Sequence, residues 1–146
     1  MAEYSYPLVQ TIAEDENIIF LDGDRCCKKG YITHRSGSGV FRLKGATNGC
    51  KAVYRVTFNA NIAVAPAADG GVLGAISVAL QEDGETLQNA VATVVPAAIG
   101  DAFNVSLTTF IIIPCGCCVT VSVENISDSG SAIDVTNANI IFDRVA

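Results

Sequence analysis

Residues 103–123, FNVSLTTFIIIPCGCCVTVSV, constrain the fold of this chain more than any other segment. They predict two strands joined by a tight turn at residues 114–117. Polar and apolar residues alternate as far as Thr109, and then the apolar run Phe-Ile-Ile-Ile follows at residues 110–113. Because successive side chains of a strand point to opposite faces, this run places apolar groups on both faces. One face can fill a core, and the other needs cover that a partner subunit would provide.

The clearest alternation lies at residues 53–64 and predicts a strand with one buried and one wet face. One face carries Tyr54, Val56, Phe58, Ala60, Ile62 and Val64, and the other carries Arg55, Thr57, Asn59 and Asn61. Further strands are predicted at residues 8–12, 17–21, 30–34, 40–44, 76–80, 86–95, 119–124 and 132–145. A parity shift in the last of them predicts a bulge near Thr136 and Asn137.

Nine or ten short strands with turn signals between them, and no helix of any length, predict an all-β fold. The expected architecture is a two-sheet β-sandwich of jelly-roll type. We expect one domain over residues 17–146, preceded at residues 1–16 by an N-terminal arm or a short edge strand. No apolar run reaches membrane-spanning length and no secretion signal is found, so we expect synthesis in a cytosol and no membrane partner.

The net charge of −6 conceals a segregation along the chain. Residues 1–24 carry six acids and no Lys or Arg, residues 25–55 carry eight bases and no acid, and residues 56–146 carry nine acids and one Arg. Either the blocks neutralise one another within one folded sheet, or the basic block meets an acidic surface of a neighbouring subunit or a larger assembly. Nucleic-acid binding is not expected, because the chain is acidic and the basic block lacks a reader motif.

The residue types that usually carry catalysis do not occur in a catalytic arrangement. The single histidine, His34, has no nucleophile elbow or second metal ligand beside it, and we expect a surface or hydrogen-bonded structural role. Glu82, Asp83 and Glu85 crowd one hairpin turn, where solvated carboxylates are expected and a weak calcium site is the alternative. We therefore expect no enzyme activity and no cofactor.

Six cysteines are many for a small cytosolic protein. A zinc site would need paired C-x-x-C knuckles, which are absent, so no metal is predicted. Disulfides from Cys26 to Cys50, or to the cluster at residues 115–118, would require oxidising conditions. The expected role is that of small buried hydrophobes. The candidates for a disulfide or for buried thiols are Cys26, Cys50, Cys117 and Cys118.

Several segments resemble small proteins encoded by phages and prophages of gut bacteria, often near genes for head structure. These segments are CCKKGYITHRSGSGVFRLKG, CKAVYRVTFNANIAV, VVPAAIGDAFNVS, PCGCCVTVSVENIS and VTNANIIFDRVA. They extend over nearly the whole chain. The family is similar to the trimeric jelly rolls of the tumour-necrosis-factor and complement globular-head type, and to the collagen-tip domains of bacterial spores. Cys115 departs from the pattern, which has a basic residue after the turn proline.

The resemblance implies a homotrimer in which each jelly roll buries an apolar, aromatic-rich sheet face around the three-fold axis. The run at residues 110–113 fits this arrangement independently, because a closed cyclic assembly hides such a patch. The aromatic residues are candidates for either the core or the axis. The interface candidates are Tyr54, Phe58, Phe110, Ile112 and Phe142.

The function expected from these observations is that of a non-enzymatic virion protein that decorates or reinforces a phage head. Its partner would be the major capsid protein or another virion protein at the capsid surface, with the acidic residues 1–24 as the docking arm. The alternative is a receptor- or glycan-binding tip domain of a phage fibre or of a cell or spore surface protein. That function would need an exposed loop aromatic, and the chain has no tryptophan. A third hypothesis is a metal- or redox-responsive module built on the cysteines.

Overall fold

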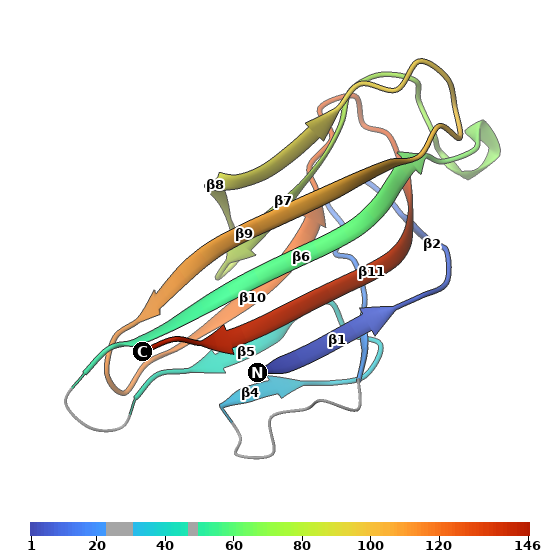
Figure 1. The fold of residues 1–146 in the computed structure, drawn as a ribbon. Helices are drawn as coiled ribbons and strands as arrows, with labels where there is room; N and C mark the ends of the chain where they lie inside the picture. The colour runs from blue at the N-terminus through green and yellow to red at the C-terminus, as the bar shows by residue number, and fades with distance from the viewer. Residues whose placement is uncertain (23–30, 47–49) are drawn as a thin grey trace.

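The computed structural model describes residues 1–22, 31–46 and 50–146, which form two antiparallel sheets (Figure 1). One sheet has six strands, with β3, β1, β11, β6 and β9 in spatial order and β2 also paired with β11. Its strands are β1 (Ala2–Tyr6), β2 (Gln10–Ile12), β3 (Leu21–Asp22), β6 (Ala52–Val64), β9 (Phe103–Ile113) and β11 (Ile133–Arg144).

The second sheet has five strands, in the order β4, β5, β10, β7 and β8. They are β4 (Ile32–His34), β5 (Phe41–Lys44), β7 (Ile76–Glu82), β8 (Glu85–Val94) and β10 (Cys118–Asn125). In the part of the chain that is described, the only helical segment is the 3-10 turn η1 (Ala67–Asp69), and no helix is long and apolar enough to cross a membrane. The predicted all-β jelly-roll sandwich is confirmed.

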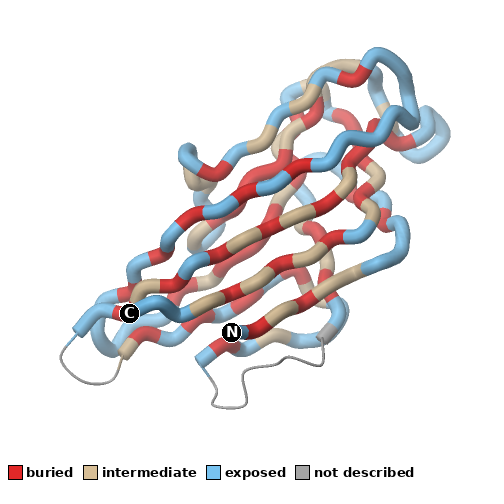
Figure 2. The backbone as a smooth tube through the Cα atoms, viewed as in Figure 1, coloured by how far each residue is buried: buried red, intermediate tan, exposed pale blue. Residues whose placement is uncertain are grey.

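The core lies between the two sheets and is filled by alternate residues of their strands (Figure 2). β6 follows the predicted pattern, with Phe58 fully buried and Arg55 exposed. Phe41 of the opposite sheet lies 5.4 Å from Phe20 and 4.8 Å from Phe142, measured between ring centroids. Aromatic pairs at such separations attract one another beyond the effect of burial alone.

The bulge predicted in the last strand is present. The register between β11 and β6 shifts between Thr136 and Asn139, and Asn137 has a positive φ of 55°. Asparagine adopts this left-handed region more readily than most residues. The shift lets Val135 before the bulge and Ala138 after it both face the core, although three positions separate them.

Residues 1–16 do not form a separate arm. β1 lies between β3 and β11, β2 adds a second pairing to β11, and both Ala2 and Tyr4 are buried in the core. The described part of this segment, residues 1–22, instead contributes β1, β2 and β3 to the sandwich, and the docking role of residues 1–24 stays a prediction. β1 itself was missed. The predicted strand at residues 17–21 consists of isolated bridges, at Asn17 and Phe20, before β3 begins.

Candidate interaction surface

The apolar run at residues 110–113 divides between the two faces of β9. Ile111 and Ile113 point into the core, with exposures of 1% and 0%, whereas Phe110 and Ile112 are 60% and 52% exposed. The alternation of β9 puts these two side chains on the outer face of the six-stranded sheet. This is the face of the run that needs cover.

Phe110 and Ile112 are joined by Val53 of β6, and we call these three residues the apolar corner. Val53 stands opposite Ile112 in the antiparallel pairing of β6 with β9, and Arg55 stands opposite Phe110. Opposed side chains of neighbouring strands lie about 4.5–5.5 Å apart at Cβ, so the corner is continuous. Since full burial of one such side chain stabilises by roughly 1.5–3 kcal/mol, association over the corner would recover a substantial free energy.

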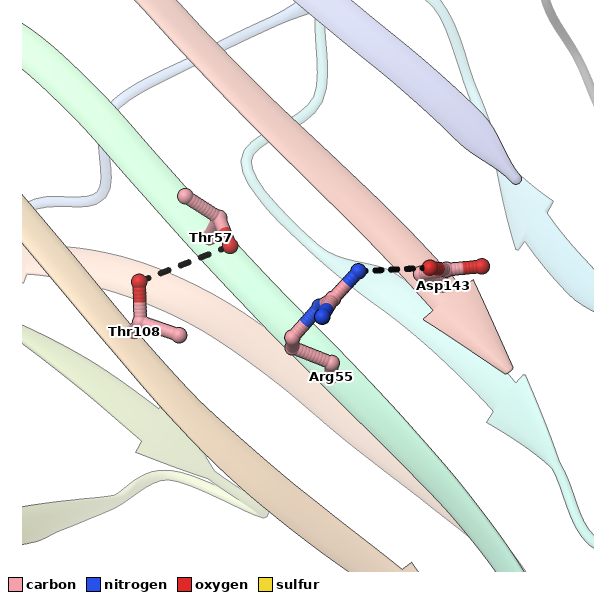
Figure 3. A network of polar contacts seen from close by, with 4 residues as sticks. All are labelled: Arg55, Thr57, Thr108 and Asp143. Carbon is pink, nitrogen blue, oxygen red and sulfur yellow. Dashed lines mark hydrogen bonds and ion pairs between the residues drawn. The ribbon is translucent and has the colours of Figure 1, made fainter. Parts of the chain in front are cut away.

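Paired polar side chains continue the outer face beyond the corner (Figure 3). Arg55 Nη2 donates to Asp143 Oδ2 at 2.8 Å, and Thr108 Oγ1 donates to Thr57 Oγ1 at 3.5 Å. The ion pair is half exposed and contributes little to folding. Its importance lies in charge balance, because a partner that covers this face buries no isolated charge at Arg55.

The same face carries an amide pair farther along β6 and β9. Asn104 Nδ2 donates to Asn61 Oδ1 at 3.1 Å, and on the same face, between β11 and β1, Asn139 Nδ2 donates to Glu3 Oε1 at 2.6 Å. The outer face of the six-stranded sheet therefore has an apolar corner at one end, with the half-buried Ile141 and several paired polar groups beyond it.

Three of the five predicted interface residues lie elsewhere. Tyr54, Phe58 and Phe142 are 1%, 0% and 1% exposed within the single chain, and Tyr54 donates its hydroxyl to the carbonyl of Lys44 at 2.7 Å. They offer no surface to another copy, so the interface prediction is corrected for them. The signal was already in the sequence, because Tyr54 and Phe58 belong to the inward face of the period-two pattern.

The prediction that the cysteines are buried is wrong for the four that the structure describes. Cys50, Cys115, Cys117 and Cys118 are free thiols and exposed. Three of them lie in or beside the β9–β10 turn, where no second layer covers the chain. Cys118 is the first residue of β10 and points outward, because the next residue, Val119, faces the core. Cys26 and Cys27 lie outside the described residues.

His34 has the structural role predicted for it. Its Nε2 lies 2.8 Å from the carbonyl oxygen of Ser38, and its ring stacks on Phe41 with centroids 4.3 Å apart. Tyr4 meets the same ring edge-on at 4.9 Å. The imidazole therefore belongs to the aromatic layer at the margin of the core.

Two carboxyl groups, Glu82 of β7 and Glu124 of β10, have environments that favour their neutral form. Burial raises the pKa of Glu82, and the neighbouring negative charge of Asp83 raises it further. Burial also raises the pKa of Glu124, as does Asp15, while a hydrogen bond with Gln81 opposes the rise. Among the described residues, no group of three or more His, Cys, Asp or Glu is placed to hold a metal ion.

No protein-family model matches this chain, and no curated protein matches its sequence. Among solved structures, the globular domain of the zebrafish complement 1qA protein is similar over 100% of this chain and 98% of its own length, with a TM-score of 0.54 and 10% identity. The C-terminal domain of EclA, a sugar-binding protein, covers 80% of this chain and 84% of its own length, with a TM-score of 0.35 and 15% identity.

The first of these similarities shows that the chain is a jelly roll of the complement globular-head type. At this identity the similarity shows the fold alone, and the second is too weak to carry an argument. The fold and the exposed face together fit a binding or structural domain.

Proposed function

We propose that this chain is the protomer of a non-enzymatic homotrimer that decorates or reinforces a phage head. The observation that carries the proposal is the apolar corner, where Phe110 and Ile112 remain 60% and 52% exposed on the outer face of the six-stranded sheet. Such a patch marks a site of association in a soluble domain. The assignment to a phage head rests on the resemblance of the sequence segments. One of these segments, PCGCCVTVSVENIS, overlaps the described turn and β10.

The position of the corner suits a cyclic assembly. β9 is the last strand in the order of the six-stranded sheet, so the corner lies at one margin of its outer face. Three copies related by a three-fold axis can each place this margin against the outer face of the next copy. Such head-to-tail contacts close into a ring and leave no corner exposed.

The five-stranded sheet remains free in this arrangement and carries basic side chains. Arg42 and Lys44 of β5 are both exposed and share the outward parity of that strand. They belong to the basic block, which in this proposal contacts an acidic surface of the major capsid protein or of another virion protein. Complementary charge of this kind accelerates docking and weakens with salt.

The experiment that tests this function uses heads made from the encoding phage or prophage after deletion of this gene. The purified chain is mixed with these heads, and the particles are sedimented. We expect the chain to sediment with the heads in multiples of three copies, and less of it to do so as the salt concentration rises. Cryo-electron microscopy of the pellet then locates it on the capsid surface.

Matched variants separate assembly from docking. R42E/K44E should remain trimeric and lose most head binding, whereas R144E, which reverses an exposed charge outside the basic block, should bind as the wild type does. Failure of the wild-type chain to sediment with the heads would refute the decoration function. Density at the tip of a fibre would support the receptor- or glycan-binding alternative instead.

A further inference from the structure

The ion pair between Arg55 and Asp143 lies at an unusual place on the outer face of the six-stranded sheet (Figure 3). β6 has 13 residues and β9 has 11, and Arg55 is the only charged residue in either strand. The antiparallel register puts Arg55 directly opposite Phe110 of β9 on one side and opposite Asp143 of β11 on the other. The one charge of these two strands therefore lies beside the exposed ring of the apolar corner.

Apolar side chains border the pair on three sides. Phe110 stands across from Arg55 on β9, and Val53 is the next outward residue along β6. Ile141 is the next outward residue from Asp143 along β11, and it is half-buried. Outward residues alternate along a strand, and opposed residues of neighbouring strands lie about 4.5–5.5 Å apart at Cβ. The pair thus lies inside the surface that association over the apolar corner would cover.

The pair is open to water in the single chain. The side chains of Arg55 and Asp143 are 49% and 33% exposed, with Arg55 Nη2 at 2.8 Å from Asp143 Oδ2. Solvent screens such a pair, so it contributes little to folding. A partner that covers the corner removes this water, and the attraction between the two charges then strengthens. The main effect of the pair is therefore expected on association rather than on folding.

The charge of this surface favours an identical copy as its partner. The positive charge of Arg55 and the negative charge of Asp143 cancel, so a strongly acidic or strongly basic partner would find no complementary charge at the corner. A second copy presents the same neutral surface, with the same exposed apolar side chains at Phe110 and Ile112. Such a copy can cover the corner without leaving an unpaired charge beneath it.

We propose that a second copy of the chain covers the Arg55–Asp143 pair and that the pair fixes the orientation in which the copies meet. This role rests on the proposed function, because it lies within the surface at which the trimer would form. Orientations that keep both charges together are tolerated, whereas those that separate them, or that bury one of them alone, are penalised. A polar group within an apolar interface selects register and number of copies in the same way in coiled coils.

The test measures association of the full chain by sedimentation velocity over a range of protein concentrations. R55L and D143L each leave one charge without its partner, and we expect each to weaken association on the order of 100-fold. R55L/D143L removes both charges and should associate within about tenfold of the wild type, but as a mixture of oligomers rather than as one species. D134L is the control, because Asp134 lies on the same face at the other end of β11, where it accepts a hydrogen bond from Thr11.

Folding is measured separately, by urea unfolding at concentrations where the variants are monomeric. The midpoints of R55L and D143L should match that of the wild type, because the pair is exposed in the single chain. The swap R55D/D143R provides a second readout, since it restores an ion pair with the two charges exchanged. It should assemble as one species even where either single variant has lost stability.

Two results would overturn the orienting role. One is wild-type association of R55L and D143L, and the other is a double variant R55L/D143L that forms the same single species as the wild type. In both results the wild-type chain still assembles, so the proposed trimer is unaffected. A wild-type chain that stays monomeric at every concentration would instead refute the trimer, and the orienting role with it.

Discussion

The outer faces of the two sheets differ in how they meet solvent. On the five-stranded sheet, Ala79, Gln81 and Ser122 alternate with core residues and yet are only 0%, 7% and 7% exposed. Gln81 stands opposite Ser122 on β10, and its Nε2 donates to Thr86 Oγ1 of β8 at 3.3 Å. Small residues on this face are thus covered by longer polar neighbours of the same sheet.

The six-stranded sheet leaves its corner open. Phe110 and Ile112 lie at its margin, and Thr57, Thr108 and Arg55 beside them are too short or already paired to cover them. A sheet face can therefore be closed from within the chain or left for another copy to close. The second solution marks the surface at which we propose that another copy of the chain docks.

The largest effect is expected where the two faces of the six-stranded sheet are compared directly. F58A removes a fully buried ring from the inward face and should destabilise the chain by about 3–5 kcal/mol. F110A removes an exposed ring and should change the unfolding free energy of the isolated protomer by about 0.5 kcal/mol or less. Urea unfolding in dilute solution measures both, and equal losses would remove the distinction between the faces.

The second-largest effect is expected when the same substitution is made on the outer faces of the two sheets. I112D places a carboxylate in the apolar corner and should weaken assembly by at least about 2 kcal/mol per contact, as expected for a central interface residue. V91D makes the same change at an exposed position of β8 and should leave the trimer intact. Sedimentation velocity distinguishes them, and dissociation of both variants, or of neither, would break the comparison.

A smaller effect is expected from a substitution that uncovers the outer face of the five-stranded sheet. Q81A removes the hydrogen bond to Thr86 and uncovers Ser122, which should cost about 1 kcal/mol of unfolding free energy. Q88A, an exposed change on β8, is the control and should have almost no effect. Thermal unfolding compares the two variants, and a harmless Q81A would mean that this face does not depend on its long polar side chain.

The smallest effect concerns pH. The pKa of Glu124 is raised in the native state, chiefly by burial, so the folded chain favours the protonated form. Its contribution to stability is present at pH values below the ordinary glutamate pKa and is lost as pH rises through the raised native value. E124Q should therefore stabilise the chain at pH 7 by roughly a few tenths of a kcal/mol, after allowance for solvent screening.

The gain from E124Q should disappear near pH 3, where the wild-type carboxyl is protonated as well. Urea titrations at the two pH values measure this difference. A variant that is less stable than the wild type at pH 7 would contradict the sign of the effect.

Much of the fold could be predicted because the alternation of polar and apolar residues along a strand shows which side chains are buried. Residues 53–64 showed which face of β6 is buried, and the parity shift located the bulge at Asn137. β1 was missed because only five residues, with polar Glu3 and Ser5 between Ala2 and Tyr4, define it. Its place depends on pairing with β11, at the opposite end of the sequence, and local pattern carries no information about that partner.

The candidate surface was only half predictable. The apolar run indicated that one face of β9 would need cover. The sequence also held the signal for which face lies outward, because Val105 and Leu107 have the same parity as Ile111 and Ile113, but that signal was not used. The cysteines were assigned to the core from residue type alone. Cys115 and Cys117 instead lie between β9 and β10, outside the strands whose alternate residues fill the core, and both are exposed.

If the proposed trimer forms, another copy of the chain covers the apolar corner in solution. Photochemical hydroxyl-radical labelling, read by peptide mass, measures the accessibility of Phe110 and Ile112 over a range of protein concentrations, with Val91 as the internal reference. Labelling of the corner should fall as the trimer forms, while labelling of Val91 stays constant. Constant labelling of Phe110 and Ile112 at every concentration, with a monomeric mass throughout, would contradict it.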